Sequence, residues 1–114
     1  PWNDPCTDYD LALSNPTSII LLARTHTALV GSVMVGFDGH RGWVYYLASD
    51  PEQRGRGIGR ALMTAAEGWL REQGCPKIQL MVRGDNAAAR GFYATVGYAE
   101  QDVVTIGRRL DDEP

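Results

Sequence analysis

The chain has 114 residues, of which 44% are hydrophobic and 22% charged, and its formal net charge is −3. This length predicts a single domain over residues 1–114, and the acidic balance argues against nucleic acid or an anionic membrane as a partner. The longest apolar stretches, such as residues 19–23, are too short to cross a bilayer, and no signal peptide is visible at the start. A cytoplasmic location is therefore expected. The two cysteines, Cys6 and Cys75, fit no metal or redox spacing, so we expect reduced thiols and no metal site.

The first half of the chain predicts one helix and three strands. In chain order these are a weak helix over 7–14 and strands over 18–24, 28–37 and 43–48. Pro16 ends the helix, because proline lacks the backbone N–H that the next turn needs. Turn-forming residues at 25–27 and 38–42 separate the strands. Short connections of this kind predict an antiparallel meander.

The second half alternates helices and strands. Apolar side chains between Ile58 and Leu70 recur at helical spacing and predict a long amphipathic helix that stops at Gly74. The alternation over 77–83 predicts a strand, Asn86 is a suitable N-cap for another helix, and 102–110 reads as a last strand. A strand, a helix and a strand in succession form a right-handed crossover between parallel strands. We therefore expect an α/β fold with a mixed sheet covered by helices.

The most informative segment is the glycine-rich turn before the long helix, Gln53-Arg54-Gly55-Arg56-Gly57-Ile58-Gly59-Arg60. Helix N-termini carry unpaired N–H groups and partial positive charge, and glycines let a phosphate approach the backbone. The three arginines add charge-assisted donors. A flexible loop with solvated arginines is the alternative, but it leaves the cost of three glycines at a helix start unexplained. The spacing matches neither a Walker A loop nor a Rossmann fingerprint, and it predicts an anion-binding site.

The spacing Arg54-x-x-Gly57-x-Gly59 resembles the Gln/Arg-x-x-Gly-x-Gly/Ala signature of the GCN5-related N-acetyltransferase (GNAT) superfamily. Two further segments resemble that family in the right order, Leu47-Ala48-Ser49-Asp50-Pro51 and Asn86-x-x-Ala89-x-x-Phe92-Tyr93-x-x-x-Gly97-Tyr98. Residues 1–5, 38–43 and 75–80 resemble the small bacterial YpeA-like acetyltransferases. The resemblance covers roughly residues 18–110 and implies the GNAT-type acyl-CoA N-acyltransferase fold.

That fold normally begins with a strand and a helix, and nothing before Ile19 reads as the strand. The resemblance therefore implies an N-terminally incomplete N-acetyltransferase domain. We expect either about 20 upstream residues or a partner chain, as in a homodimer, to cover the first sheet edge.

The family's activity is the transfer of an acetyl group from acetyl-CoA to an amine of a small molecule or peptide. By resemblance, backbone groups of Leu47 and Ser49 would pair with the pantetheine amides. Asn86 would contact the pantetheine and Arg90 the nucleotide phosphate, while Tyr93 would protonate the leaving thiolate. The pyrophosphate would be held by the turn, that is by Arg54, Gly55, Arg56, Gly57, Ile58, Gly59 and Arg60.

The general base stays open, because Met81 occupies the position where related N-terminal acetyltransferases often carry a glutamate. Candidates are His40, Tyr45, Asp38 or a chain of waters, and the acceptor pocket is expected from residues 2–15 and 36–43. Two other functions remain as alternatives. The first is a non-catalytic module that senses acyl-CoA, which the missing glutamate permits. The second is a different nucleotide-binding domain.

Overall fold

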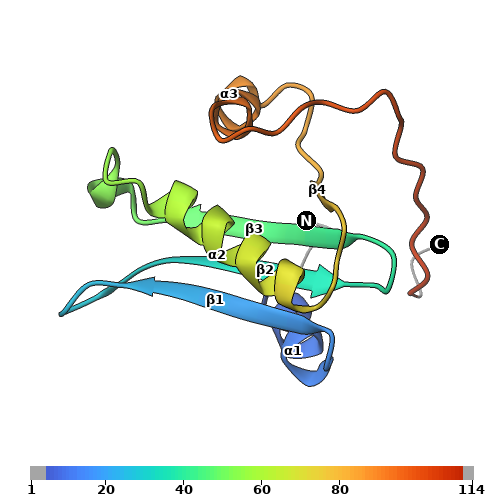
Figure 1. Ribbon diagram of the computed structural model, residues 1–114, viewed down its shortest axis with the longest axis horizontal. Coiled ribbons are helices and arrows are strands. Elements are labelled where there is room, and N and C mark those ends of the chain that lie inside the picture. The colour runs from blue at the N-terminus through green and yellow to red at the C-terminus, as the bar shows by residue number, and fades with distance from the viewer. Residues whose placement is uncertain (1–4, 112–114) are drawn as a thin grey trace. The chain divides into compact units, whose positions relative to one another are not determined.

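The computed structural model describes residues 5–111, and the chain divides after Met81 into two compact units. The first unit contains seven elements, labelled in Figure 1 except for the short η1: α1 (Pro5–Ser14), β1 (Ser18–Arg24), β2 (Leu29–Phe37), β3 (Gly42–Ser49), η1 (Pro51–Gln53), α2 (Ile58–Glu72) and β4 (Ile78–Leu80). The second unit contains α3 (Ala87–Thr95) followed by an extended segment. The predicted elements up to α3 are thus confirmed, with ends shifted by a few residues.

The sheet of the first unit has the order β1-β2-β3-β4, with antiparallel pairing up to β3 and parallel pairing between β3 and β4. The strand–helix–strand crossover through α2 produces that parallel pair, as the sequence predicts. The hairpin between β2 and β3 closes through a hydrogen bond from Asp38 N to Arg41 O of 3.2 Å. Consequently β3 runs away from this hairpin and ends beside the glycine-rich turn, at the opposite end of the sheet (Figure 1).

One face of the sheet packs against α2. Two glycines allow this close approach, because a Cβ at Gly31 would lie 2.8 Å from Ile58 Cγ2, and one at Gly42 would lie 2.5 Å from Leu70 Cδ1. The buried apolar side chains of the strands and of α2 are Val30, Val33, Val35, Val44, Leu62, Met63, Ala66 and Leu70, and Met34 is buried on the opposite face. Burying this apolar stripe is the main force that holds the helix on the sheet.

The other face carries α1, which contacts β1 and β2 and buries Ala12. Side chains alternate between the faces of a strand, and residues paired across two strands share a face. Since Gly31 faces α2, Met34 and its partner Tyr45 lie on the α1 side. The sheet is therefore covered by α2 on one face and partly by α1 on the other.

Two predicted strands differ from the structure. The strand expected over 77–83 is limited to Ile78–Leu80, because the parallel ladder with β3 ends at the pair Val44–Leu80. The prediction of a strand over 102–110 is wrong. This segment forms no strand, and its apolar residues, such as Val104 and Ile106, are exposed. Alternating polarity alone does not make a strand, because the ladder requires a neighbouring backbone.

β1 forms one edge of the sheet, and its outer side pairs with no strand among residues 5–111. That an upstream strand or a partner chain covers this edge stays a prediction. No helix within the described residues is long and apolar enough to cross a membrane. Cys75 is a free cysteine whose thiol donates to Lys77 O at 3.2 Å, whereas the side chain of Cys6 lies outside the described part.

Candidate acyl-CoA site

The glycine-rich turn joins the end of β3 to the start of α2. Asp50 begins it by accepting a hydrogen bond from Glu52 N at 3.0 Å, which caps the short helix η1. Gly55 and Gly57 then adopt left-handed backbone angles, with φ of 80° and 76°. A Cβ at either position would meet nothing within 4 Å. These glycines are therefore required for the shape of the turn, and the space beside them is open to a ligand.

The start of α2 has no side-chain cap. Its N-cap residue is Gly57, which offers no oxygen to the first helical N–H groups. Within the described residues, the N–H groups of Gly57, Ile58 and Gly59 donate to no protein acceptor. An uncapped N-terminus of a 15-residue helix combines free donors with the positive end of the helix dipole. The turn has the properties of an anion site.

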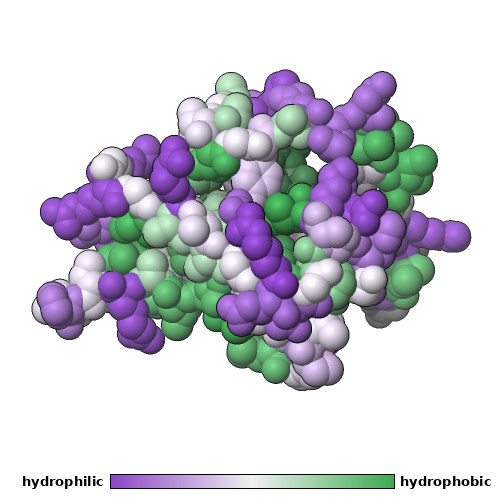
Figure 2. Space-filling model, viewed as in Figure 1, coloured by the Kyte–Doolittle hydropathy of each residue, from purple (hydrophilic) through white to green (hydrophobic). Residues whose placement is uncertain are grey.

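Three arginines surround this helix start, and all of them are exposed: Arg54, Arg56 and Arg60. Hydrophilic residues also gather in Figure 2 at the end of the first unit where the turn lies. The part of the chain that the structure describes contains no ion pair of Arg54 or Arg56. Their guanidinium groups thus add positive charge that no direct ion pair with a described carboxylate neutralises.

The strand that leads to the turn has backbone groups available for a ligand. Asp50 N donates to Val30 O at 2.8 Å, so the backbone groups of Ser49, one residue earlier, point away from β2. On that side the ladder of β3 with β4 ends at the pair Val44–Leu80, so it does not reach Ser49. Ser49 therefore presents an unpaired edge, as expected for a strand that pairs with an extended ligand.

A bulge precedes this edge. Ser32 pairs with Ala48 and Met34 pairs with Tyr45, so both Tyr46 and Leu47 lie opposite Val33. Tyr46 has φ of 54° and is the one described residue other than glycine in the left-handed region. A bulge of this kind bends the strand and redirects a side chain. Nothing in the sequence signals it, because tyrosine rarely adopts this conformation.

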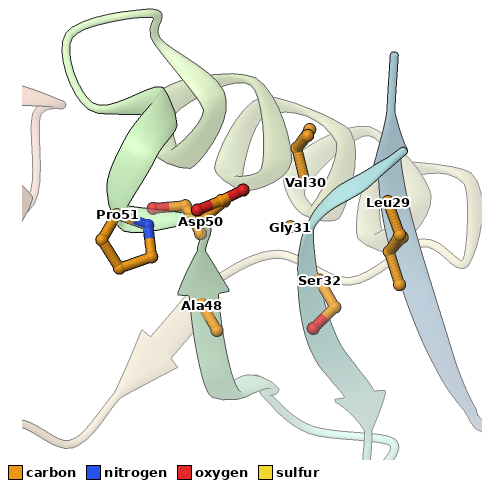
Figure 3. Close-up of a pocket in the computed structure, with 8 residues that line it drawn as sticks. Leu29, Val30, Gly31, Ser32, Ala48, Asp50 and Pro51 are labelled. Atoms are coloured by element: carbon orange, nitrogen blue, oxygen red, sulfur yellow. The ribbon is translucent and has the colours of Figure 1, made fainter. Parts of the chain in front are cut away.

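A hollow of about 360 Å³ lies next to the turn, between the start of β2 and the end of β3. Its walls are Leu29, Val30, Gly31, Ser32, Ala48, Ser49, Asp50 and Pro51 (Figure 3). Ala48 and Ser32 lie side by side on paired strands, as Figure 3 shows. Ser49 thus borders both this hollow and the open edge of β3.

The remaining predicted residues belong to the second unit. Asn86 caps α3, its side-chain oxygen accepting from Ala89 N at 3.0 Å. Arg90 is held by Glu100 and also donates to Gly84 O at 2.9 Å. Tyr93 packs edge-on against Phe92 and Tyr98, with ring centroids 5.0 and 5.9 Å away. Burial raises the pKa of Tyr93 above its usual value, so the phenol keeps its proton at neutral pH.

Asp38 is fully engaged within the β2–β3 hairpin. Hydrogen bonds from the backbone N–H groups of Arg41 and His40, each 2.7 Å, and a longer one from Trp43 Nε1 lower the pKa of Asp38. A carboxylate held in its ionised form is a poor proton acceptor near pH 7. Asp38 is therefore better explained as the residue that shapes the hairpin.

The two other side chains considered as the base are no better suited. Burial and, to a lesser extent, the charge of Asp38 raise the pKa of Tyr45, which leaves it a neutral phenol. His40 is exposed in the hairpin, with Nδ1 3.4 Å from the guanidinium of Arg41. This hairpin and the glycine-rich turn lie at opposite ends of the sheet (Figure 1). Of the candidates for the general base, ordered water is therefore the one that remains.

The structure thus brings together the sequence-predicted residues of the first unit, namely the backbone of Ser49 and Leu47 and the turn from Arg54 to Arg60. Asn86, Arg90 and Tyr93 lie together on or beside α3 in the second unit. Sequence reasoning missed the bulge at Tyr46 and the bond from its hydroxyl to Asp8 of α1. Both depend on contacts between residues far apart in the chain.

Curated proteins of similar sequence are acetyltransferases. The chain is 47% identical over 113 residues to an acetyltransferase of Pectobacterium atrosepticum, covering 99% of this chain and 80% of that protein. It is 46% identical over 110 residues to an acetyltransferase of Yersinia enterocolitica, covering 96% of this chain and 78% of the relative.

Solved structures share the fold at lower identity. The enzyme AAC(6')-Iy in complex with the bisubstrate analog CoA-S-monomethyl-acetylneamine has a TM-score of 0.81 at 16% identity, with 96% of this chain and 80% of that chain covered. The aminoglycoside antibiotic 6'-N-acetyltransferase AAC(6')-IG from Acinetobacter haemolyticus has a TM-score of 0.80 at 18% identity, with 96% and 86% covered.

A family model also matches most of the sequence. Residues 1–98 match the acetyltransferase (GNAT) family. This match spans the sheet, the glycine-rich turn and α3. Together with relatives of more than 45% identity, it shows that the chain belongs to the GNAT family of acetyltransferases.

Proposed function

We propose that this protein transfers the acetyl group of acetyl-CoA to a primary amine of a small molecule or peptide by direct attack. The observation that carries the proposal is the uncapped N-terminus of α2, where Gly55 and Gly57 leave open space beside unpaired N–H groups. A pyrophosphate there would accept hydrogen bonds from the backbone and benefit from the helix dipole and the arginines. The turn directly follows β3, so one extended ligand can occupy both.

The backbone edge at Leu47 and Ser49 would receive the pantetheine arm. An extended arm with amide groups can pair with an open strand edge much as an added strand does. The ladder of β3 with β4 stops at Val44, which supports this role for the residues that follow. The thioester would then lie near the bulge of β3, beyond the pantetheine amides.

In the chemical step, the neutral amine attacks the thioester carbonyl carbon and a tetrahedral intermediate forms. As this collapses, the C–S bond breaks, the amide is released, and the sulfur takes a proton. Tyr93 is the proposed donor of that proton, a role carried over from the family motif Phe92-Tyr93, and its raised pKa keeps the proton available. The amine loses its own proton to ordered water, because none of the three side-chain candidates suits this role.

An acyl-CoA sensor without turnover is the second candidate. Its support is Met81, a residue without a titratable group at the position where related enzymes often carry a glutamate. The distinction lies in catalysis and not in binding, because both candidates require the acetyl-CoA site.

Release of free thiol from acetyl-CoA, measured across a panel of aliphatic amines, aminoglycosides and peptides, tests the proposed function. Calorimetry with acetyl-CoA and with ATP or NAD accompanies it. Acetyl-CoA binding with amine-dependent thiol release supports the transferase. Binding without release for any amine favours the sensor, and preference for ATP or NAD over acetyl-CoA would overturn both.

A further inference from the structure

The hydroxyl of Tyr46 donates to the carboxylate of Asp8, with 2.5 Å between Oη and Oδ2. This part-buried bond joins β3 to α1 across 38 positions of the sequence. Hydrogen bonds to a carboxylate are shorter and stronger than those between neutral groups. The bond therefore ties α1 to the strand that the proposed function assigns to acyl-CoA.

Tyr46 needs such a restraint because its backbone is unfavourable. A residue with a Cβ in the left-handed region typically costs about 1–2 kcal/mol. Such a conformation persists only where surrounding contacts specify it. The register across Val33 leaves Tyr46 and Leu47 as the two bulged residues, where the regular one-to-one pairing of β3 with β2 is interrupted. A bond from outside the sheet is thus well placed to stabilise the bulge.

The bulge also determines where Tyr46 points. Tyr45 lies on the α1 side through its pairing with Met34, so regular alternation would direct Tyr46 toward α2. Its bond to Asp8 shows that Tyr46 also points to the α1 side. The extra residue restores alternation further along, where Ser49 pairs with Gly31 and Ala48 with Ser32. The orientation of the backbone at Leu47 and Ser49 thus depends on the conformation of Tyr46.

We propose that Asp8 and Tyr46 are positioning residues for the acyl-pantetheine arm. Their hydrogen bond holds the β3 bulge in the conformation that presents the backbone of Leu47 and Ser49 to the arm. This inference rests on the proposed function, since it assigns a purpose to the same strand edge. It also assigns α1 a role in acyl-CoA binding that the turn alone does not require.

The test compares two ligands in five variants, the fifth of which combines Tyr46→Phe with Asp8→Ala. Acetyl-CoA would occupy both the turn and the strand edge, whereas ADP carries a diphosphate without a pantetheine arm and would occupy only the turn. Tyr46→Phe and Asp8→Ala each remove the bond. Asp8→Asn retains an oxygen that can accept from the hydroxyl, and Asp10→Ala is the matched control, an exposed aspartate of the same helix. Binding is measured by calorimetry for acetyl-CoA and by competition for ADP, and the melting temperature of each variant is recorded.

We expect Tyr46→Phe and Asp8→Ala each to weaken acetyl-CoA binding about fivefold, which corresponds to one hydrogen bond. ADP binding should stay within about twofold of wild type in both, since no contact of the turn is altered. Asp8→Asn should recover part of the loss, and Asp10→Ala should bind acetyl-CoA like wild type. The double variant should be no weaker than either single one, because both remove the same interaction.

The inference is overturned if both variants bind acetyl-CoA like wild type, or if acetyl-CoA and ADP are weakened equally. The second result would indicate general destabilisation instead of a local effect at the bulge. Failure of wild type to bind acetyl-CoA, or of ADP to compete with it, would instead count against the proposed function. The two failures are therefore distinguishable.

Discussion

The guanidinium of Arg90 forms a bidentate ion pair with the carboxylate of Glu100. The distance from Nε to Oε2 is 2.9 Å, and that from Nη2 to Oε1 is 3.1 Å. Together with its bond to Gly84 O, this pair links the segments on both sides of α3. The arrangement gives Arg90 a structural role in its own unit. It competes with the proposed contact between Arg90 and a nucleotide phosphate.

Two variants separate these roles. Arg90→Gln and Glu100→Gln both break the pair, but only the first removes the positive charge. We expect Arg90→Gln to weaken CoA binding severalfold and Glu100→Gln to leave it unchanged or make it tighter, because the second change frees the guanidinium from a competing carboxylate; calorimetry measures both. Because the side chains of Arg90 and Glu100 are 44% and 72% exposed, each change should cost at most about 1 kcal/mol of stability. Equal weakening by both variants would identify Arg90 as purely structural.

A side chain in the glycine-rich turn should block the pyrophosphate. Gly57→Glu adds both bulk and negative charge where the proposed ligand lies. We expect the affinity for acetyl-CoA to fall by at least about 100-fold, because charge repulsion adds to the loss of backbone contacts. Calorimetry measures the affinity, and circular dichroism confirms that the variant is folded.

Gly39→Glu is the matched control for backbone strain. Gly39 also has a left-handed backbone, with φ of 92°, and open space around its Cβ position. Both variants should lose about 1–2 kcal/mol of stability, since any residue with a Cβ is strained there. Only the change at Gly57 should lower the affinity for acetyl-CoA. Unaltered affinity in a folded Gly57→Glu protein would refute the assignment of the turn.

Tyr93→Phe should reduce turnover more than it weakens binding. The hydroxyl is needed mainly as negative charge develops on the sulfur, so kcat should fall by about 10- to 100-fold while the Kd for acetyl-CoA stays within about twofold. Steady-state kinetics with the cognate amine and calorimetry provide the two numbers. Unchanged turnover would make Tyr93 a packing residue of the cluster with Phe92 and Tyr98, and water the proton donor.

His40→Ala should leave the pH dependence of kcat/KM unchanged. His40 is exposed in a hairpin at the far end of β3, so its imidazole is poorly placed to accept a proton from the amine. The expected result is an acidic limb with the same midpoint as wild type and a rate within about twofold. His26→Ala, at the other exposed histidine, controls for the loss of an imidazole. Loss of the acidic limb in His40→Ala alone would restore His40 as the base.

The local pattern of the sequence was sufficient to predict most elements of the fold. The apolar stripe from Ile58 to Leu70 predicted α2, and Asn86 predicted the start of α3, because periodicity and capping depend on nearby residues. The glycine-rich turn was recognisable for the same reason. Glycine adopts the left-handed backbone seen at Gly55 and Gly57 without a steric cost, and the N–H groups of a helix start favour an anion in any sequence.

The sequence by itself thus determined the elements up to α3, their crossover, and the turn where the anion would bind. Only the tertiary structure decided that the pairing of β3 with β4 stops at Val44 and that residues 102–110 form no strand. It also decided that Tyr46 bulges toward Asp8. The physical reason is that helices, caps and turns satisfy their hydrogen bonds locally, whereas strand length, bulges and bonds between distant residues depend on which backbone lies alongside.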